Sequence, residues 1–139
     1  MFNKNNIYAG NFFSKQIKKE NYIEYYDDNR NLKKSLIYFH EKDPTKVKFF
    51  IQFHQNSLNR KFLAKYDENQ KIEKTIEYLI DGSKFVEKKY DKETKKNIEE
   101  IRYFRGGIKK NMFIQSDRIT GRIIKYKIYN EQGEIINSY

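Results

Sequence analysis

The chain closes an apolar run with a bulky residue about every thirteen positions. These closing residues, called anchors below, are Tyr26, Phe39, Phe53, Tyr66, Tyr78, Tyr90, Phe104, Ser116 and Tyr129. The steps between them are 13, 14, 13, 12, 12, 14, 12 and 13 residues. Such a step accommodates one strand of about five to seven residues and one tight turn. The spacing therefore predicts a long series of β-hairpins, which defines an architecture rather than an activity.

Turn-forming residues follow most of the anchors. An Asp or Asn stands directly after five of them, namely Asp27, Asp67, Asp91, Asp117 and Asn130. Their side chains can bond the backbone two residues further on, and glycine adopts positive φ without steric cost. We therefore predict that Gly121 and Gly133 lie at positive φ and close the last two hairpins. Asp81-Gly82 and Gly106-Gly107 are further hairpin signals.

Apolar and polar residues alternate between the turns with a period of two rather than 3.6. On this period the predicted sets that share a face are Val47, Phe49, Ile51 and Phe53, then Ile72, Ile76, Tyr78 and Ile80, then Ile124, Tyr126 and Ile128. Alternation is typical of a sheet with a drier and a wetter face. We predict an all-β fold, an antiparallel meander of repeated hairpins in a single-layer or gently curled sheet. The repeat domain spans 22–139, after a segment, 1–21, whose structure the sequence leaves open.

Composition limits the class of protein. The 139 residues suffice for one domain, and 12 Tyr and 11 Phe with no Trp suit a thin sheet whose rings keep their hydroxyls wet. The absence of cysteine excludes disulfides and thiolate chemistry. No run is apolar enough to span a bilayer. The N-terminus lacks the apolar region of an intact signal peptide, so both a secreted protein without its leader and a cytoplasmic one stay open.

The net charge of +10 raises the question of an anionic partner. Lys outnumbers Arg by 23 to 6, a bias that A/T-rich coding explains better than phosphate recognition, where Arg would be favoured. Lysines near turns also commonly protect solvated sheet edges, so a solvated surface is the favoured interpretation. The strongest candidate surface for an anion or another partner comprises Lys109, Lys110, Arg122, Lys125, Lys127 and Tyr129. In it Lys125, Lys127 and Tyr129 should share one face.

Catalytic constellations are scarce. The histidines His40 and His54 each follow an anchor, in the position that Asp occupies in other turns, and we interpret them as structural. A metal site made of both histidines and Asp43 would require their two turns to lie at one edge of the sheet. No nucleophile elbow or phosphate-binding loop is present. We therefore expect no catalytic residues, no cofactor and no metal.

Three units of the chain resemble a known repeat. They are YDKETKKNIEEIRYF, SDRITGRIIKYKIYNEQGEII and KYDENQKIEKTIEYLIDG. They are similar to the short repeats of a phytoplasma family of unknown function, Y-D-x-x-T-G-x-x-I-K followed by an aromatic residue and a Gly-containing turn. The pattern is more distantly similar to MORN-type repeats, which form elongated sheets of hairpins. Ser116 in place of an aromatic anchor, Lys95 in place of Gly, and the longer turn at Asp43-Pro44-Thr45 depart from it. The resemblance implies the fold and no activity.

Three classes of function are compatible with these features. A non-catalytic repeat scaffold that binds a protein through an exposed sheet face or an edge strand is favoured, since stacked hairpins present extended surfaces. The alternative is a basic module that binds nucleic acid or acidic lipid headgroups. An enzyme is the least favoured class.

Overall fold

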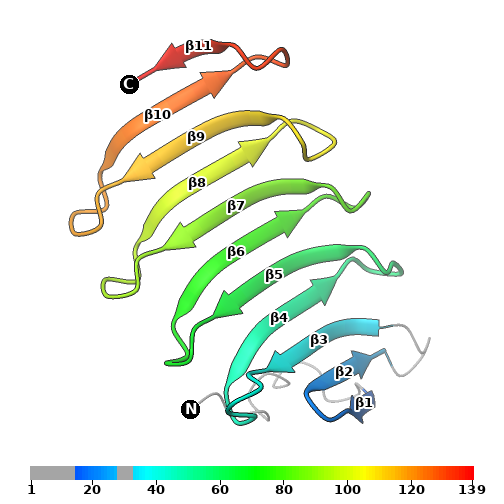
Figure 1. Cartoon of the computed structure of the whole chain (residues 1–139). Coiled ribbons are helices and arrows are strands. Elements are labelled where there is room, and N and C mark those ends of the chain that lie inside the picture. Colours follow the sequence, from blue (N-terminus) through cyan, green and yellow to red (C-terminus); the bar gives the residue numbers. More distant parts are fainter. Residues whose placement is uncertain (1–14, 28–32) are drawn as a thin grey trace.

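Eleven strands follow one another in the computed structural model, which describes residues 15–27 and 33–139 (Figure 1). They are β1 (Lys15–Lys18), β2 (Tyr22–Tyr26), β3 (Lys33–Phe39), β4 (Val47–Phe53), β5 (Arg60–Tyr66), β6 (Ile72–Tyr78), β7 (Lys84–Tyr90), β8 (Asn97–Tyr103), β9 (Lys110–Ser116), β10 (Ile123–Tyr129) and β11 (Ile135–Ser138). Each pairs antiparallel with its neighbour in sequence, in one open sheet. The predicted all-β meander of hairpins is confirmed, and the described ranges contain no helix. β1 lies within the 1–21 segment.

The strands end where the sequence places the anchors, with one exception. Every strand from β3 to β10 has seven residues, and all of them except β8 end on the predicted anchor. β8 ends at Tyr103, and the backbone N–H of Phe104 opens the turn by donating to the carbonyl of Lys109 at 2.9 Å. The prediction of Phe104 was therefore wrong by one residue. Tyr103 and Phe104 are both aromatic, so residue type alone does not show which of the two ends the strand.

A β-bulge recurs at the second residue of every strand from β3 to β11. In β4, Val47 lies opposite Phe39 and Phe49 lies opposite Tyr38, so Lys48 has no residue opposite it. The equivalent residues of the other strands are Lys34, Lys61, Glu73, Phe85, Ile98, Asn111, Ile124 and Ile136. Because a bulge inserts one residue into a period of two, the first residue of each strand lies on the opposite face from the third.

The bulges overturn parts of the predicted face assignments. Val47 is separated from Phe49 and packs instead on the side of Phe50, in the main apolar cluster. Ile72 is likewise separated from Ile76 by the bulge at Glu73. A strict period of two, counted from the first residue of a strand, cannot detect this change of face.

Two further members of the predicted sets lie outside the regular pairing of the strands. Ile80 belongs to the turn between β6 and β7 rather than to a strand. In β10, Ile124 is the bulge residue and has no residue of β9 opposite it, whereas Ile123 lies on the face of Tyr126 through its pairing with Ser116. The prediction that Lys125 and Lys127 share the opposite face holds, because they follow the bulge.

Cross-strand register defines the two faces, since directly opposed residues project to the same side. The central row of face A is Ile23, Ile37, Phe50, Ala64, Thr75, Lys88, Glu100, Ile114 and Tyr126. The central row of face B is Glu24, Leu36, Ile51, Leu63, Ile76, Glu87, Ile101, Phe113, Lys127 and Ser138.

Apolar packing is concentrated in the first strands. Ile37 is fully buried on face A, and Ile23, Phe39 and Val47 pack around it. The turns gather at the two ends of the strands (Figure 1). Those after β3, β5, β7 and β9 form the His40 end, and those after β4, β6, β8 and β10 form the His54 end. The last two strands differ from the first, because all four residues of β11 are exposed.

Candidate binding surface

A buried carboxylate in β7 neutralises the cations around it. Glu87 is 8 % exposed and pairs with Lys74 Nζ at 2.7 Å and Lys84 Nζ at 3.4 Å. It also accepts a hydrogen bond from the Tyr103 hydroxyl at 3.1 Å. Burial raises the pKa of Glu87, but the hydrogen bond and charge of Lys74, with the smaller effects of Lys84 and Tyr103, bring that pKa below its ordinary value. Two lysines of face B are thus compensated within the sheet.

Face A of the same strands is compensated in the same way. Glu100 is buried and accepts a bond from Arg102 Nε at 2.7 Å, while Lys88 Nζ lies 3.8 Å from it. On face B, Lys89 Nζ lies 3.4 Å from Glu99. The middle of the sheet therefore presents little unbalanced charge to a partner.

The last strands present cations of a different kind. Lys110, Lys125 and Lys127 form no ion pair with any residue of the described ranges. Lys125 lies opposite Gln115, and Lys127 lies opposite Phe113. Face B of β9 and β10 therefore carries three lysines with no carboxylate directly opposite them.

The structure brings together some members of the predicted surface and separates another. Lys110, Lys125, Lys127 and Tyr129 lie on face B of β9 and β10, with Lys109 in the turn beside Lys110. Arg122 precedes β10 at the His40 end, where its carbonyl accepts the Asp117 N–H at 2.8 Å. Tyr129 lies seven residues further on at the His54 end, roughly 23 Å away at the rise of a strand. Arg122 is therefore remote from the aromatic side chain.

Sequence reasoning missed one residue of this surface. Phe113 lies in the central row of face B, directly opposite Lys127, and offers an aromatic ring among the unpaired lysines. With a period of two, Phe113 and the anchor Ser116 lie on opposite faces of β9. Because of the bulge at Ile124, the residue of β10 opposite Phe113 is Lys127. The two strands had to be put in register before this neighbour could be recognised.

The two histidines lie in turns, at opposite ends of β4. The His40 N–H donates to the Lys46 carbonyl at 2.9 Å, and the His54 N–H donates to the Asn59 carbonyl at 3.0 Å. The imidazole Nε2 of His54 also bonds the carbonyl oxygen of Tyr78 at 3.0 Å. A shared metal site with Asp43 is excluded by this geometry, because the seven residues of β4 separate the histidines. The described residues contain no cluster of three or more metal-ligating side chains.

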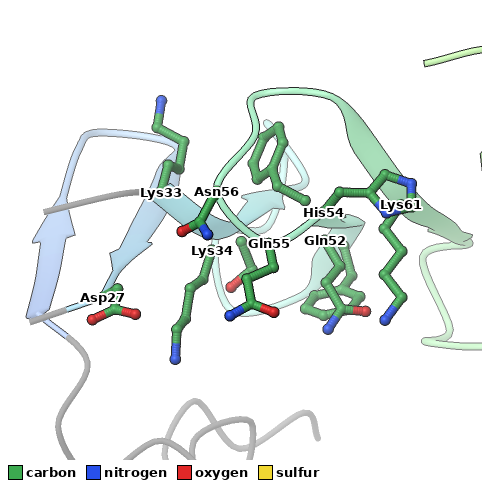
Figure 2. A pocket seen from close by; sticks show the side chains of 11 residues that line it. Asp27, Lys33, Lys34, Gln52, His54, Gln55, Asn56 and Lys61 are labelled. Atoms are coloured by element: carbon green, nitrogen blue, oxygen red, sulfur yellow. The ribbon is translucent and has the colours of Figure 1, made fainter. Parts of the chain in front are cut away.

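A concavity of about 350 Å³ lies on face A at the His54 end (Figure 2). Figure 2 shows Lys34 and Lys61 pointing to the same side as Gln52 and Gln55, while Lys33 points to the other side. Lys34 and Lys61 are both bulge residues, and the extra residue turns them toward face A. Most of the lining residues are polar, and Phe50 and Phe53 contribute two aromatic rings. The concavity provides a depression that carries three lysines, Lys33, Lys34 and Lys61.

No helix in the described ranges is long and apolar enough to cross a membrane. No family model and no curated protein matches the chain. The resemblance to the phytoplasma repeats and to MORN-type repeats therefore stays a prediction.

Similar solved structures include a crystal structure of TarM, with a TM-score of 0.42 and 9 % identity. They also include an S. aureus TarM mutant in complex with Fondaparinux, alpha-GlcNAc-glycerol and UDP (0.44, 9 %) and a GtfA/B complex bound to UDP and GlcNAc (0.43, 12 %). The matches cover 89, 94 and 92 % of this chain but 21, 22 and 24 % of those chains. The chain thus spans less than a quarter of each structure's length. At these TM-scores the likeness establishes neither a shared family nor a shared activity.

Proposed function

We propose that the protein is a non-catalytic repeat scaffold that binds another protein through β10 and β11. The observation that carries this proposal is a contrast between equivalent positions of the repeat. Val47 and Ile123 are each the first residue of their strand and lie on face A, yet Val47 is 1 % exposed and Ile123 is 51 % exposed. The first position of the strand is therefore apolar in both β4 and β10, but its side chain is buried only in β4.

Other apolar side chains of the last hairpin are exposed as well. Ile124, Ile135 and Ile136 are 54, 51 and 64 % exposed, and all three lie in β10 or β11. Ile123 and Ile124 open β10 at the His40 end, and Ile135 and Ile136 open β11 at the His54 end, so the exposed residues form two adjacent pairs about 20 Å apart along the hairpin. Exposed apolar residues scattered singly are normal, whereas clustered ones mark interaction sites. Burial in a protein interface would recover about 25 cal/mol for each Å² removed from water. A protein partner that covers the last hairpin from end to end accounts for both pairs.

Site-specific photocrosslinking tests this proposal. A photoreactive amino acid at Ile136 should give protein adducts that survive nuclease treatment. The matched control is the same substitution at Phe85, which is the equivalent bulge residue in β7 and is itself 45 % exposed. Equal adduct yields at the two positions, or adducts that nuclease removes, would contradict the proposal.

A second candidate function rests on the unpaired cations. Lys110, Lys125 and Lys127 share face B with Phe113 and Tyr129. A basic groove with aromatic side chains is the usual surface for single-stranded nucleic acid. Acidic lipid headgroups would bind the same lysines but would not need the two aromatic rings. Binding of an oligonucleotide at several salt concentrations separates this candidate from the first.

A further inference from the structure

We propose that three turns of the His54 end dock the protein on an acidic lipid surface, with their apolar tips entering the membrane interface. This inference goes beyond the proposed protein-binding function and uses other residues. Each of the turns after β4, β6 and β8 exposes one large aliphatic side chain. They are Leu58, Ile80 and Ile108, which are 74, 69 and 88 % exposed. The four turns of the His40 end together expose one, Ile119, at 67 %.

The three turns form one continuous row at the same end of the strands (Figure 1). The side-chain amide of Asn59, in the first turn, donates to the carbonyl of Ile80 in the second at 2.9 Å. The third turn approaches the second so closely that a Cβ on Gly107 would lie 3.2 Å from the Cβ of Ser83. The tips are therefore held in fixed positions relative to one another, and a planar surface can touch all three at once.

Charge at this end favours an anionic surface. The stretches 54–61, 79–85 and 104–111 comprise each turn and the first two residues of the next strand. They contain one carboxylate, Asp81, and six cations, namely Arg60, Lys61, Lys84, Arg105, Lys109 and Lys110. Lys84 pairs with Glu87, and the other five form no ion pair with any described residue. Clusters of Lys and Arg beside a membrane bind acidic headgroups.

The His40 end is nearly neutral by the same count. Its equivalent stretches, 40–48, 67–73, 91–98 and 117–124, hold nine cations and eight carboxylates. The turn after β10 adds Glu131 and Glu134 to the His54 end, which still leaves twice as many cations as carboxylates there. The end that exposes the aliphatic tips is therefore also the basic end.

Strand register places an aromatic residue beside the cation nearest each turn. The directly opposed pairs are Phe53 with Arg60, Tyr78 with Lys84, and Tyr103 with Lys110. At the His40 end, the residues opposite Phe39, Tyr66 and Tyr90 are the neutral Val47, Ile72 and Asn97. Aromatic rings and the long stems of Lys and Arg suit the headgroup level, where one part of a side chain is in apolar surroundings and the other is hydrated. Aliphatic tips followed by rings and cations match the layers of a membrane interface.

Other partners match this end less well. A nucleic acid would pair with the cations but would leave the aliphatic tips in water. A second copy of the chain would bring the same excess of cations and be repelled. A protein would have to supply carboxylates and an apolar surface along the whole row of turns, whereas an acidic bilayer supplies both in one plane.

Sedimentation of the intact chain with vesicles tests the proposal. We expect binding to vesicles of phosphatidylserine and phosphatidylcholine in equal parts, and at least tenfold weaker binding to phosphatidylcholine alone. Ile108→Ser should weaken binding to the acidic vesicles roughly tenfold. The matched control is Ile119→Ser, also at an exposed turn position, and it should bind as the wild type does. Both residues are exposed, so neither change should alter the circular dichroism.

A pair of charge variants provides the second arm. Arg105→Gln with Lys109→Gln should weaken binding at least tenfold, because each cation near an acidic membrane contributes about fivefold. Lys42→Gln with Lys92→Gln removes two exposed lysines from turns of the His40 end and should leave binding nearly unchanged.

A fluorescent reporter measures the entry of a tip into the membrane. Because the chain has no cysteine, Ile108→Cys and Ile119→Cys each provide a single site for an environment-sensitive dye. With acidic vesicles, emission from position 108 should rise and shift to the blue, and emission from position 119 should stay as it is in buffer. Equal responses at the two positions, equal binding by the two charge variants, or no binding to acidic vesicles would overturn the inference.

Two further outcomes would assign the binding elsewhere. If Lys125→Gln with Lys127→Gln abolishes vesicle binding while Arg105→Gln with Lys109→Gln retains it, the lysines of β10 are the lipid site and the inference fails. If acidic vesicles do not bind and a photoreactive amino acid at Ile108 captures a protein, the row of turns is a protein interface and the inference also fails.

Discussion

The side-chain amide of Gln70 closes a two-point hydrogen bond with the backbone of Val47. Its carbonyl oxygen accepts the Val47 N–H and its NH₂ donates to the Val47 carbonyl, both at 2.9 Å. Gln70 lies in the turn after β5, and Val47 is the first residue of β4. At the His40 end, this contact therefore links the turn after β5 to the start of β4, in addition to the backbone hydrogen bonds between the two strands. Gln70 holds this position at φ 62°, in a region that glycine would adopt more easily.

Replacement of Gln70 by Gly should destabilise the protein. The loss of both bonds leaves polar groups of Val47 unsatisfied, at a cost of roughly 1–3 kcal/mol. Glycine would relieve the backbone strain at this positive φ, but that gain is smaller than the cost of the lost hydrogen bonds. The free energy of unfolding should therefore fall. Urea denaturation followed by far-UV circular dichroism measures the change. A Gln70→Gly variant more stable than the wild type would show that the contact to Val47 contributes nothing.

Lys95→Gly should have the opposite effect. Lys95 lies at φ 62° in the turn after β7, where Gly121 has φ 75° in the turn after β9. No hydrogen bond of the Lys95 side chain to another described residue is present to lose. We expect a gain of about 0.5–1 kcal/mol from the relieved strain. The same urea titration checks it, and a loss of stability would refute the strain argument.

The positive φ predicted for Gly121 and Gly133 is confirmed, at 75° and 84°. Gly133→Val should cost roughly 1–3 kcal/mol through backbone strain alone, because a Cβ there would meet no atom within 4 Å. Gly107→Ala should cost more than Gly133→Ala. Its φ is 72°, and its Cβ would come within 2.6 Å of the Lys84 backbone nitrogen. Equal melting temperatures of the two Ala variants would mean that this approach of the two turns is absent in solution.

Stability should fall in acid through the turn carboxylates. The backbone N–H of Thr94, followed by the side chain of Arg118, lowers the pKa of Asp91 from 3.8 to about 2. The N–H groups of Thr120 and Ile119 lower the pKa of Asp117 as well. A carboxyl whose pKa is lower in the folded state stabilises the fold above its unfolded pKa and loses that contribution as the pH falls through the folded one.

The melting temperature should therefore hold from neutral pH to about pH 4 and decline between about pH 4 and 2. Asp91→Asn combined with Asp117→Asn should lower it at neutral pH and shrink the acid decline. Glu131→Gln, at an exposed turn position, serves as the matched control. An acid decline of the same size in the double variant would contradict the assignment to these turns.

Nucleic-acid binding should be weak if the last strands serve a protein partner. Each phosphate contact would make log K fall with log salt by about 0.7–0.9, and stacking on Tyr129 would add roughly 1–3 kcal/mol per base. We expect feeble binding of dT20 at physiological salt and little change in Lys125→Glu with Lys127→Glu. Tight binding whose salt slope flattens by about two contacts in that variant, but not in Lys88→Glu with Lys89→Glu, would favour the second candidate function.

Much of the fold could be predicted because anchors and turn residues carry local signals. An Asp after an anchor accepts backbone bonds whatever the rest of the sheet does, as Asp67 does from Asn69 and Lys71 at 2.8 and 2.9 Å. The bulges could not be predicted in this way. Their positions hold Lys, Glu, Phe, Ile and Asn without preference, so no residue type marks them.

Predicting which residues form the binding surface requires the register between neighbouring strands, and the sequence alone does not give that register. Lys125, Lys127 and Tyr129 lie in one strand after its bulge, so a period of two placed them correctly. Phe113 joins them only when β9 and β10 are aligned. Whether a lysine is compensated is also a cross-strand property. Lys74 pairs with Glu87 thirteen residues away, whereas Lys127 has no carboxylate opposite it.

Hydrogen–deuterium exchange with and without the partner tests the central claim most directly. The partner is the protein that crosslinks at Ile136, purified and added back to the intact chain. Amides of residues 123–139 should gain protection, while those of β6, β7 and β8 should exchange as before. Protection confined to the central strands, or no change in β10 and β11 on binding, would contradict the assignment of the last hairpin as the binding surface.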